Sequence, residues 1–187
     1  WMLSTFRDDM RTELALGGYA MVPMHAKFMS RALPCAPRLT RLVIHHAYFG
    51  DGGVAHLANA LAQPGCILED LHLAGVHMGD DGAKALGDAL RVNRKLDLLN
   101  IENNCITDRG AIALADALEH DNTTLMELKL GSNAIGSAGC AALLAVFSRS
   151  PRREAWVSVA FQVARRPVPT TPMLNVWSSA DARRVVA

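Results

Sequence analysis

A glycine-rich run is the first part of the sequence whose residue types could do chemistry. Gly50–Ala55 spells G-x-G-x-x-A between an apolar segment and a helical pattern. Glycines in this arrangement admit a pyrophosphate to the N-terminus of a helix, as in dinucleotide-binding folds. No loop of the form G-x-x-x-x-G-K-[ST] accompanies it, because Ala85 follows Lys84 where a hydroxyl is required.

Histidines form the second group. His45, His46, His72 and His77 fall in or near two successive apolar segments. Imidazoles on neighbouring strands could bind a transition metal with a carboxylate such as Asp70. However, His45 and His72 are two positions out of step, so they would lie diagonally rather than opposite each other. We therefore expect no metal site, and we interpret these residues as a polar, partly titratable patch on a binding surface.

Both groups lie inside a repeat of 28 or 29 residues, in which residues of one type recur at fixed offsets. One unit contains Leu68, Leu71, Leu73, Met78, Gly82, Leu86 and Leu90; the next contains Leu96, Leu99, Ile101, Ile106, Gly110, Leu114 and Leu118. Units starting at Leu39 and Leu125 follow the same offsets. Gly53 occupies the glycine position of its unit, so the repeat accounts for the glycine run without a ligand. We expect no cofactor and no catalytic residue.

Each unit predicts a short strand followed by a helix. Its first half alternates, as in Leu71-x-Leu73, which is the period of a strand with one buried face. Its second half places apolar residues on one helical face, from Gly82 through Leu86 to Leu90. Successive strands joined through helices must run parallel.

The sequence from Leu96 to Leu118, LDLLNIENNCITDRGAIALADAL, resembles a leucine-rich repeat of the ribonuclease-inhibitor type. That type also occurs in NOD-like receptors and in Ran GTPase-activating proteins. The resemblance implies an α/β leucine-rich repeat solenoid, a horseshoe arc with a parallel inner sheet and outer helices. About five repeats are expected, at 11–38, 39–67, 68–95, 96–124 and 125–148, the first of them degraded as terminal repeats usually are.

Two segments flank this array. Residues 1–10 form an N-terminal flank, and the start at Trp1 indicates a piece of a longer chain. Residues 149–187 carry seven Arg against two acids, and we expect them to form a broken terminal repeat, with a last strand near 155–160, and a disordered tail. Residues 1–148, the flank and the array together, carry 12 basic and 16 acidic residues.

Asn104 and Asn133 occupy one position of the repeat, where the strand ends. A buried amide there can satisfy backbone groups that the turn leaves without partners. Units with Ala47 or Val76 at this position lack the amide, so we expect their turns to be looser or held by other partners. Asn122-Thr123-Thr124 matches a glycosylation sequon but is interpreted as a polar turn between helix and strand.

Bulk properties exclude some partners. A net charge of +1 gives no general attraction to nucleic acid, and no run reaches the ~18 apolar residues of a membrane span. Four dispersed cysteines without a C-x-x-C pair favour reduced thiols in a cytoplasmic protein.

The remaining candidates are the strand residues that face the hollow of the arc. They are Arg41, Val43, His45, Asp70, His72, Leu98, Asn100, Glu102, Glu127 and Lys129. Charges around a few apolar residues are typical of a protein-binding surface. We predict a non-catalytic interaction scaffold that binds a protein partner here. The resemblance leaves two alternatives: a GTPase-activating module using Arg41 or Arg109, and a sensor fragment of a NOD-like receptor.

Overall fold

The computed structural model describes residues 12–18 and 21–149. The elements follow one another in the order β1 (Glu13–Gly17), α2 (Pro23–Ala32), the 3-10 helix η1 (Leu33–Cys35), β2 (Arg41–His45), α3 (Gly50–Leu61), β3 (Asp70–Ala74), α4 (Asp80–Leu90), β4 (Leu98–Asn100), α5 (Asp108–His120), β5 (Glu127–Lys129) and α6 (Ser137–Arg149). The predicted flank at 1–10, the strand near 155–160 and the tail lie outside the described residues.

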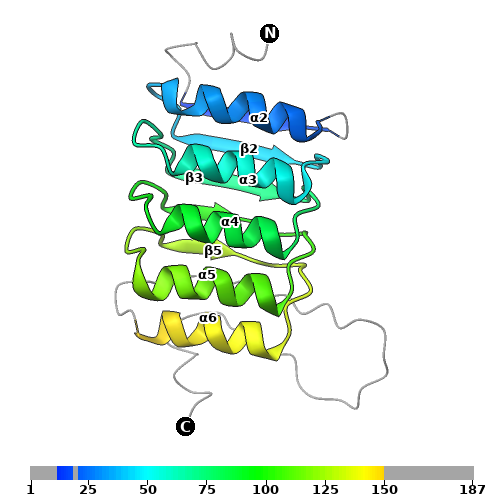
Figure 1. Ribbon diagram of the computed structural model, residues 1–187, viewed down its shortest axis with the longest axis vertical. Helices are drawn as coiled ribbons and strands as arrows, with labels where there is room; N and C mark the ends of the chain where they lie inside the picture. The colour runs from blue at the N-terminus through cyan, green and yellow to red at the C-terminus, as the bar shows by residue number, and fades with distance from the viewer. Residues whose placement is uncertain (1–11, 19–20, 150–187) are drawn as a thin grey trace.

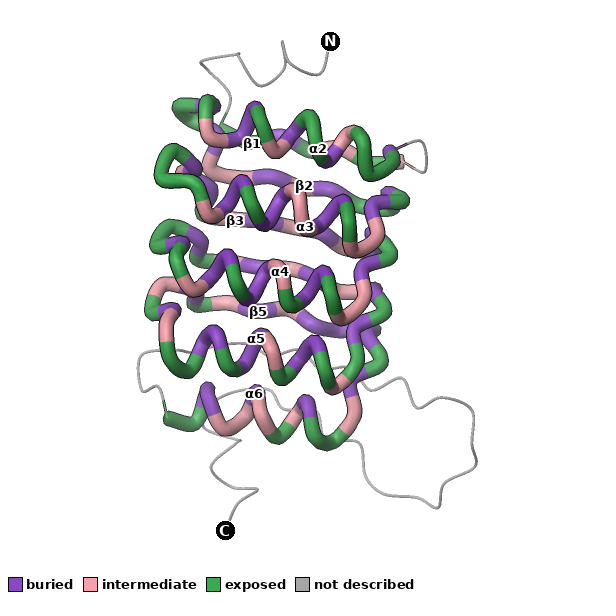
Figure 2. The backbone as a smooth tube through the Cα atoms, viewed as in Figure 1, coloured by how far each residue is buried: buried purple, intermediate pink, exposed green. Residues whose placement is uncertain are grey.

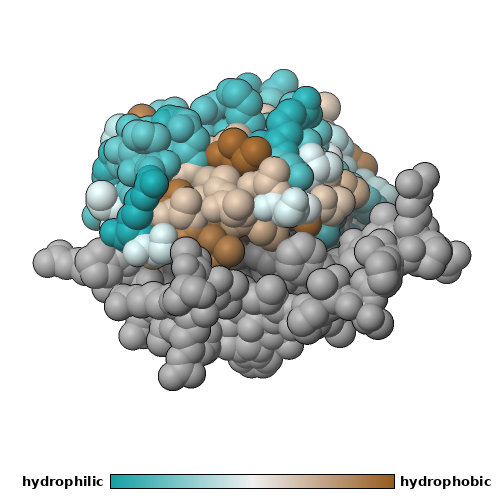
Figure 3. All heavy atoms as spheres, turned by 90° about the horizontal axis from the view of Figure 1, so that it is seen from below, coloured by the Kyte–Doolittle hydropathy of each residue, from teal (hydrophilic) through white to brown (hydrophobic). Residues whose placement is uncertain are grey.

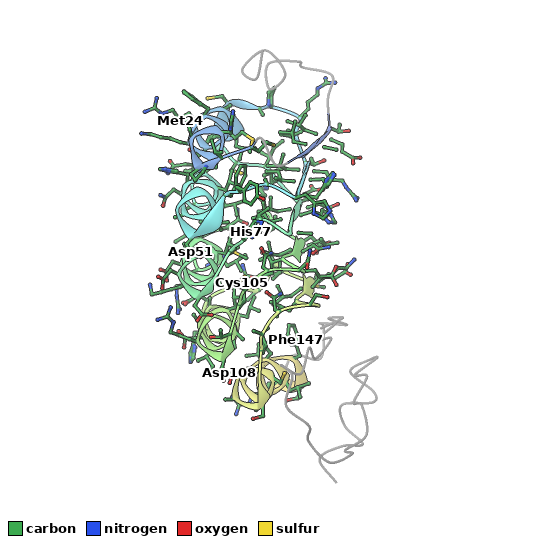
Figure 4. The ribbon with its side chains drawn as sticks, turned by 90° about the vertical axis from the view of Figure 1, so that its right-hand side faces the viewer. Met24, Asp51, His77, Cys105, Asp108 and Phe147 are labelled. Atoms are coloured by element: carbon green, nitrogen blue, oxygen red, sulfur yellow. The ribbon has the colours of Figure 1, made fainter. Side chains whose placement is uncertain are left out.

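The five strands form one parallel sheet in chain order. Glu13, Arg41, Asp70, Leu98 and Glu127 are aligned across it, so adjacent strands pair at the 28- or 29-residue offset of the repeat. The helices stack in the same order and form a second layer on one side of the sheet (Figures 1 and 4). This confirms the α/β repeat solenoid that the sequence predicts.

The core lies between these two layers. The repeat's apolar positions are buried, and Leu71, Leu99 and Leu128 are at most 1% exposed. Small residues such as Ala83 and Ala111 are fully buried where neighbouring helices pack. Figure 2 shows buried residues interspersed with intermediate and exposed ones along the labelled strands and helices. Apolar residues also gather on the visible part of the end face nearest α6 (Figure 3).

An aspartate in the first turn of one helix caps the N-terminus of the next. Asp51 Oδ1 accepts hydrogen bonds from the backbone N–H groups of Gly79 (2.7 Å) and Gly82 (2.8 Å), at the start of α4. Asp108 repeats this with Gly136 and Gly139, at 2.7 and 2.8 Å. A carboxylate is favourable there because a helix N-terminus carries unsatisfied N–H groups and partial positive charge.

The cap and an apolar side chain together leave no room for a Cβ at the glycine position of the repeat. A Cβ added at Gly82 would lie 2.8 Å from Asp51 Oδ1 and 2.5 Å from Met78 Cγ, and one at Gly139 would lie 2.8 Å from both Asp108 Oδ1 and Ile135 Cγ2. The N-termini of α4 and α6 are therefore filled by carboxylates of this chain. Asp51 belongs to the glycine-rich run, and its carboxylate is hydrogen-bonded to the start of α4.

Buried asparagines bond to backbone groups of the turns after the strands, as predicted, and they also tie each turn to the next unit, which was not predicted. Asn104 Nδ2 donates to three backbone carbonyls, including that of Leu73, and its Oδ1 accepts from the N–H groups of Val76 and Met78. Asn133 acts in the same way on the carbonyl of Ile101. The Val76 turn, which lacks its own amide, is thus held by the asparagine of the following unit.

Candidate protein-binding face

The ten predicted residues lie along the strands on the side of the sheet away from the helices. Eight are half-exposed strand residues: Arg41, Asp70, Leu98 and Glu127 in one row, and Val43, His72, Asn100 and Lys129 in the next. His45 is exposed at the end of β2, and Glu102 follows β4. We call these ten residues, with the neighbouring Glu13, the sheet face. The register brings the two rows together as the sequence predicts.

Ion pairs within the chain hold most charges of this face. The Arg41 guanidinium lies 3.5 Å from the Glu13 carboxylate and 3.3 Å from that of Asp70. Lys129 Nζ lies 3.1 Å from Glu127 Oε1. Such partly exposed pairs contribute little to stability, typically below ~1 kcal/mol, but they restrict the side chains. Both cations of the sheet face are therefore already engaged by carboxylates of the chain.

Glu102 has a different kind of partner. Asn100 Nδ2 donates to Glu102 Oε2 at 3.2 Å, and Asn100 Oδ1 accepts from the Glu102 backbone N–H at 3.0 Å. The amide orients the carboxylate without neutralising its charge. The sheet face thus keeps negative charge beside β4.

His72 lies at the middle of the second row, between Val43 and Asn100. Its Nε2 is buried and has no hydrogen-bond partner among the described residues. Burial lowers the pKa of the imidazole, and the Arg41 guanidinium lowers it further. A neutral ring near neutral pH leaves Nε2 as a hydrogen-bonding group to be satisfied, and burying such a group without a partner costs free energy.

Leu98 is the apolar centre of the first row. It is half-exposed and stands between Asp70 and Glu127 on the adjacent strands. Together with Val43 it provides apolar surface next to His72, with charged groups around it. This arrangement matches the usual anatomy of a protein interface, in which a small apolar centre is surrounded by polar groups.

The four histidines do not gather at one site, although the rings of His45 and His46 are in edge contact with centroids 5.6 Å apart. His45 and His72 are diagonal, as predicted, because His45 pairs in register with Ala74. His77 lies after β3 and stacks on Tyr48, with ring centroids 4.8 Å apart and an interplanar angle of 13°. Within the described residues, no three His, Cys, Asp or Glu side chains come together as a potential metal site.

Two features of this region are absent from the predicted set. The Tyr48–His77 stack lies on the edge where strands lead into helices, and Figure 4 shows His77 and Cys105 there. Its sequence signal is that residues 48 and 77 occupy the same position of the repeat. The capping aspartates also recur at one position, two residues before the glycine in each of three units.

Together, the stacked β/α units and the outward-facing strand residues define a solenoid with a mixed apolar and charged sheet surface. A family model described as "Leucine Rich repeat" matches residues 66–87, 92–115 and 121–144. The protein is a leucine-rich repeat protein of the ribonuclease-inhibitor-like type, since its relatives include both ribonuclease inhibitors and NACHT, LRR and PYD proteins.

Individual relatives match part of the chain. Mouse "NACHT, LRR and PYD domains-containing protein 14" is 32% identical over 133 residues, 71% of this chain and 13% of that protein; its human counterpart is 29% identical over 138 residues. Pig "Ribonuclease inhibitor" is 35% identical over 92 residues, 49% of this chain and 20% of the inhibitor. The chain thus spans about an eighth of the NACHT, LRR and PYD proteins it matches.

A solved structure shares the fold. "Leiomodin-1 Actin-Binding Site 2 (ABS2)" superimposes with a TM-score of 0.54 and 17% identity, covering 99% of this chain and 83% of that one. In the part of the chain that the structure describes, no helix is both long and apolar enough to cross a membrane.

Proposed function

We propose that this chain is a non-catalytic scaffold that binds a protein partner through the sheet face. Leucine-rich repeats commonly serve as protein-interaction modules, and relatives such as ribonuclease inhibitor are generally non-catalytic. The observation that carries the proposal is the buried Nε2 of His72, which has no partner among the described residues and lies in the same surface as half-exposed Leu98. A bound protein would cover the leucine, and it would hydrogen-bond to that nitrogen once the His72 ring turns Nε2 outward.

The proposal includes the organisation and the setting of the chain. The five repeats at 11–38, 39–67, 68–95, 96–124 and 125–148 form the binding array, with 1–10 and 149–187 as flanking segments. The protein acts in the cytoplasm and forms part of a longer chain. The matches span only 13% of much longer relatives, which supports the proposal of a longer chain.

One alternative has a specific observation in its favour. Relatives with NACHT, LRR and PYD domains match up to 74% of the chain, which favours the repeat segment of a receptor of that type. The GTPase-activating alternative gains no such support. Its two candidate arginines are both engaged within the chain: Arg41 by Glu13 and Asp70, and Arg109 by Asp80 and Asp81.

A comparison of bound proteins tests the proposed surface. The full chain, the variant carrying His72→Glu and Glu102→Arg together, and the variant Asp81→Lys would each be used to capture proteins from a cell extract. Asp81 is an exposed residue of α4 on the helix layer, so Asp81→Lys is a matched control for a charge change. We expect the double variant alone to lose its specific partners. An unchanged set of partners would refute binding through the sheet face.

A further inference from the structure

We propose that the sheet face binds a basic segment of its partner, in which a Lys or Arg lays its aliphatic stem over Leu98 and places its cation between Asp70 and Glu127. This inference rests on the proposed function and specifies the chemistry of the partner.

Charge balance on the sheet face favours a basic segment. The face carries the carboxylates of Glu13, Asp70, Glu102 and Glu127 against the cations of Arg41 and Lys129, a net charge of −2. One guanidinium serves two of the carboxylates, and Glu102 is held by an amide alone. His72 adds no positive charge near neutral pH, because burial and the nearby Arg41 lower the pKa of its imidazole.

On the helix layer, several acidic side chains already have arginine partners. Arg91 bonds to Asp116 and Asp121, and Arg149 bonds to Glu119. On the sheet face, Asp70 and Glu127 are likewise paired, with Arg41 and Lys129, whereas the carboxylate of Glu102 is bonded to an amide. The uncompensated negative charge of the sheet face therefore lies at Glu102. Complementary charge across an interface selects partners and speeds their association.

The surroundings of Leu98 define where the cation would lie. Strands β3 and β5 are two strand spacings apart, roughly 10 Å, with β4 between them. Leu98 thus offers a half-exposed apolar platform flanked by the carboxylates of Asp70 and Glu127. Lys and Arg pack their methylene stems on apolar surface while the charged head stays near polar groups. A cation added there would share these two carboxylates with Arg41 and Lys129, which already pair with them.

His72 supplies the second contact. It lies in the next row of the sheet, opposite Asn100, one strand from Leu98. A neutral imidazole nitrogen accepts or donates one hydrogen bond, depending on the tautomer. A rotation of the ring that turns the buried Nε2 outward would let a backbone amide or hydroxyl next to the basic residue bond to it. The basic residue and this polar group together define a short recognition element on the partner.

Selection of peptides tests the inference directly. A random peptide library displayed on phage would be selected on the full chain, and each selected peptide would be synthesised for binding measurements by fluorescence anisotropy. We expect selected peptides that bind the sheet face to carry Lys or Arg. Their Kd should rise at least about tenfold in Glu127→Lys, the result of losing one close charge contact and gaining a repulsive one.

Control variants separate this effect from damage to the fold. Asp81→Lys makes the same charge change on α4 and should leave the Kd within about twofold. Glu102→Lys serves as an independent second variant on the sheet face and should also weaken binding. Circular dichroism would verify that each variant keeps the helical signal of the wild-type chain.

Three outcomes would overturn the inference, and they differ in what they imply. Acidic peptides that lose affinity in the His72→Glu, Glu102→Arg variant would refute a basic partner but retain the sheet face as the binding surface. Peptides insensitive to every sheet-face substitution would refute the proposed function as well. Self-association of the chain that disappears in Glu127→Lys would identify a second copy of the chain as the occupant.

Discussion

Removal of the Asp80 carboxylate should uncouple two neighbouring helices of the stack. Asp80 lies in the first turn of α4 and caps the N-terminus of α5. Its Oδ1 accepts from the backbone N–H groups of Thr107 (2.8 Å) and Gly110 (3.0 Å), and its Oδ2 accepts from the Thr107 hydroxyl (2.7 Å). The substitution Asp80→Ala removes all three bonds and leaves the buried Gly110 N–H without this acceptor.

The expected loss follows from the character of these bonds. Hydrogen bonds to a charged group contribute roughly 1.5–3 kcal/mol each, and loss of an N-cap costs about 0.5–2 kcal/mol. These figures describe overlapping contacts and are not added in full, so we expect Asp80→Ala to lower the free energy of unfolding by about 3 kcal/mol. Asp80→Asn keeps a neutral acceptor, and we expect about half that loss, because charge-assisted bonds are about twice as strong as neutral ones.

The pH dependence tests the role of the charge. Burial alone would raise the pKa of the Asp80 carboxyl, but the Thr107 hydroxyl and the N–H groups of Thr107 and Gly110 hold the pKa below its ordinary value. A carboxyl with a depressed pKa in the folded state adds stability above its unfolded pKa of about 3.9, and this stability is lost as the pH falls through the folded pKa. The difference between wild type and Asp80→Asn should therefore be complete at neutral pH and shrink below about pH 4.

Urea-induced unfolding, followed by far-ultraviolet circular dichroism, measures these differences. Asp81→Ala is the matched control, because Asp81 is the next residue in the same helix and its pair with Arg109 is exposed. That control should cost no more than about 0.5 kcal/mol. A loss for Asp80→Ala no larger than that of Asp81→Ala would refute the capping role. A wild-type advantage over Asp80→Asn that persists undiminished in acid would refute the part assigned to the charge.

Three further predictions concern single positions. Gly110→Ala would place a Cβ 2.7 Å from Asp80 Oδ1 and should cost about 1–3 kcal/mol in urea unfolding, with less than additive loss when combined with Asp80→Ala. Asn104→Ala removes five hydrogen bonds and should cost about 3 kcal/mol or more, whereas Asn103→Gly at an exposed position with φ of 56° should change stability by less than about 0.5 kcal/mol. Because the folded-state pKa of His72 is lowered, wild type should lose stability as the pH falls below about 6.5, and His72→Gln should show a smaller loss between pH 7 and 5.5 in thermal unfolding.

The arrangement of strands and helices could be predicted because each position of the repeat has a size requirement. Leu71, Leu99 and Leu128 must all enter the same core, so their spacing sets which residues are neighbours across the sheet. The role of Asn104 was also predictable, since an amide at the end of a buried strand has few partners other than the backbone.

The capping aspartates were not predicted, although they recur at one position. Their hydrogen-bond partners lie 27–31 residues away in the next unit. An aspartate in the first turn of an exposed helix usually interacts with its own helix only, so its position gives no indication of a partner in another unit. Asn122 was predicted only as part of a polar turn. It does lie between α5 and β5, but it is 2% exposed and donates to the Leu90 carbonyl of the preceding unit.

The sequence could not rank the residues of the sheet face, because strand alternation turns every second side chain outward in the same way. The interactions of each side chain within the structure distinguish the residues of the sheet face from one another. Arg41 and Lys129 are held by carboxylates of the chain, so a partner must compete with existing ion pairs to use them. Covering Leu98 removes half-exposed apolar surface from water. Turning the His72 ring outward to a partner would give Nε2 the hydrogen bond that it lacks among the described residues. For that reason, we expect the binding free energy to concentrate at His72 and Leu98 rather than at the more prominent charges around them.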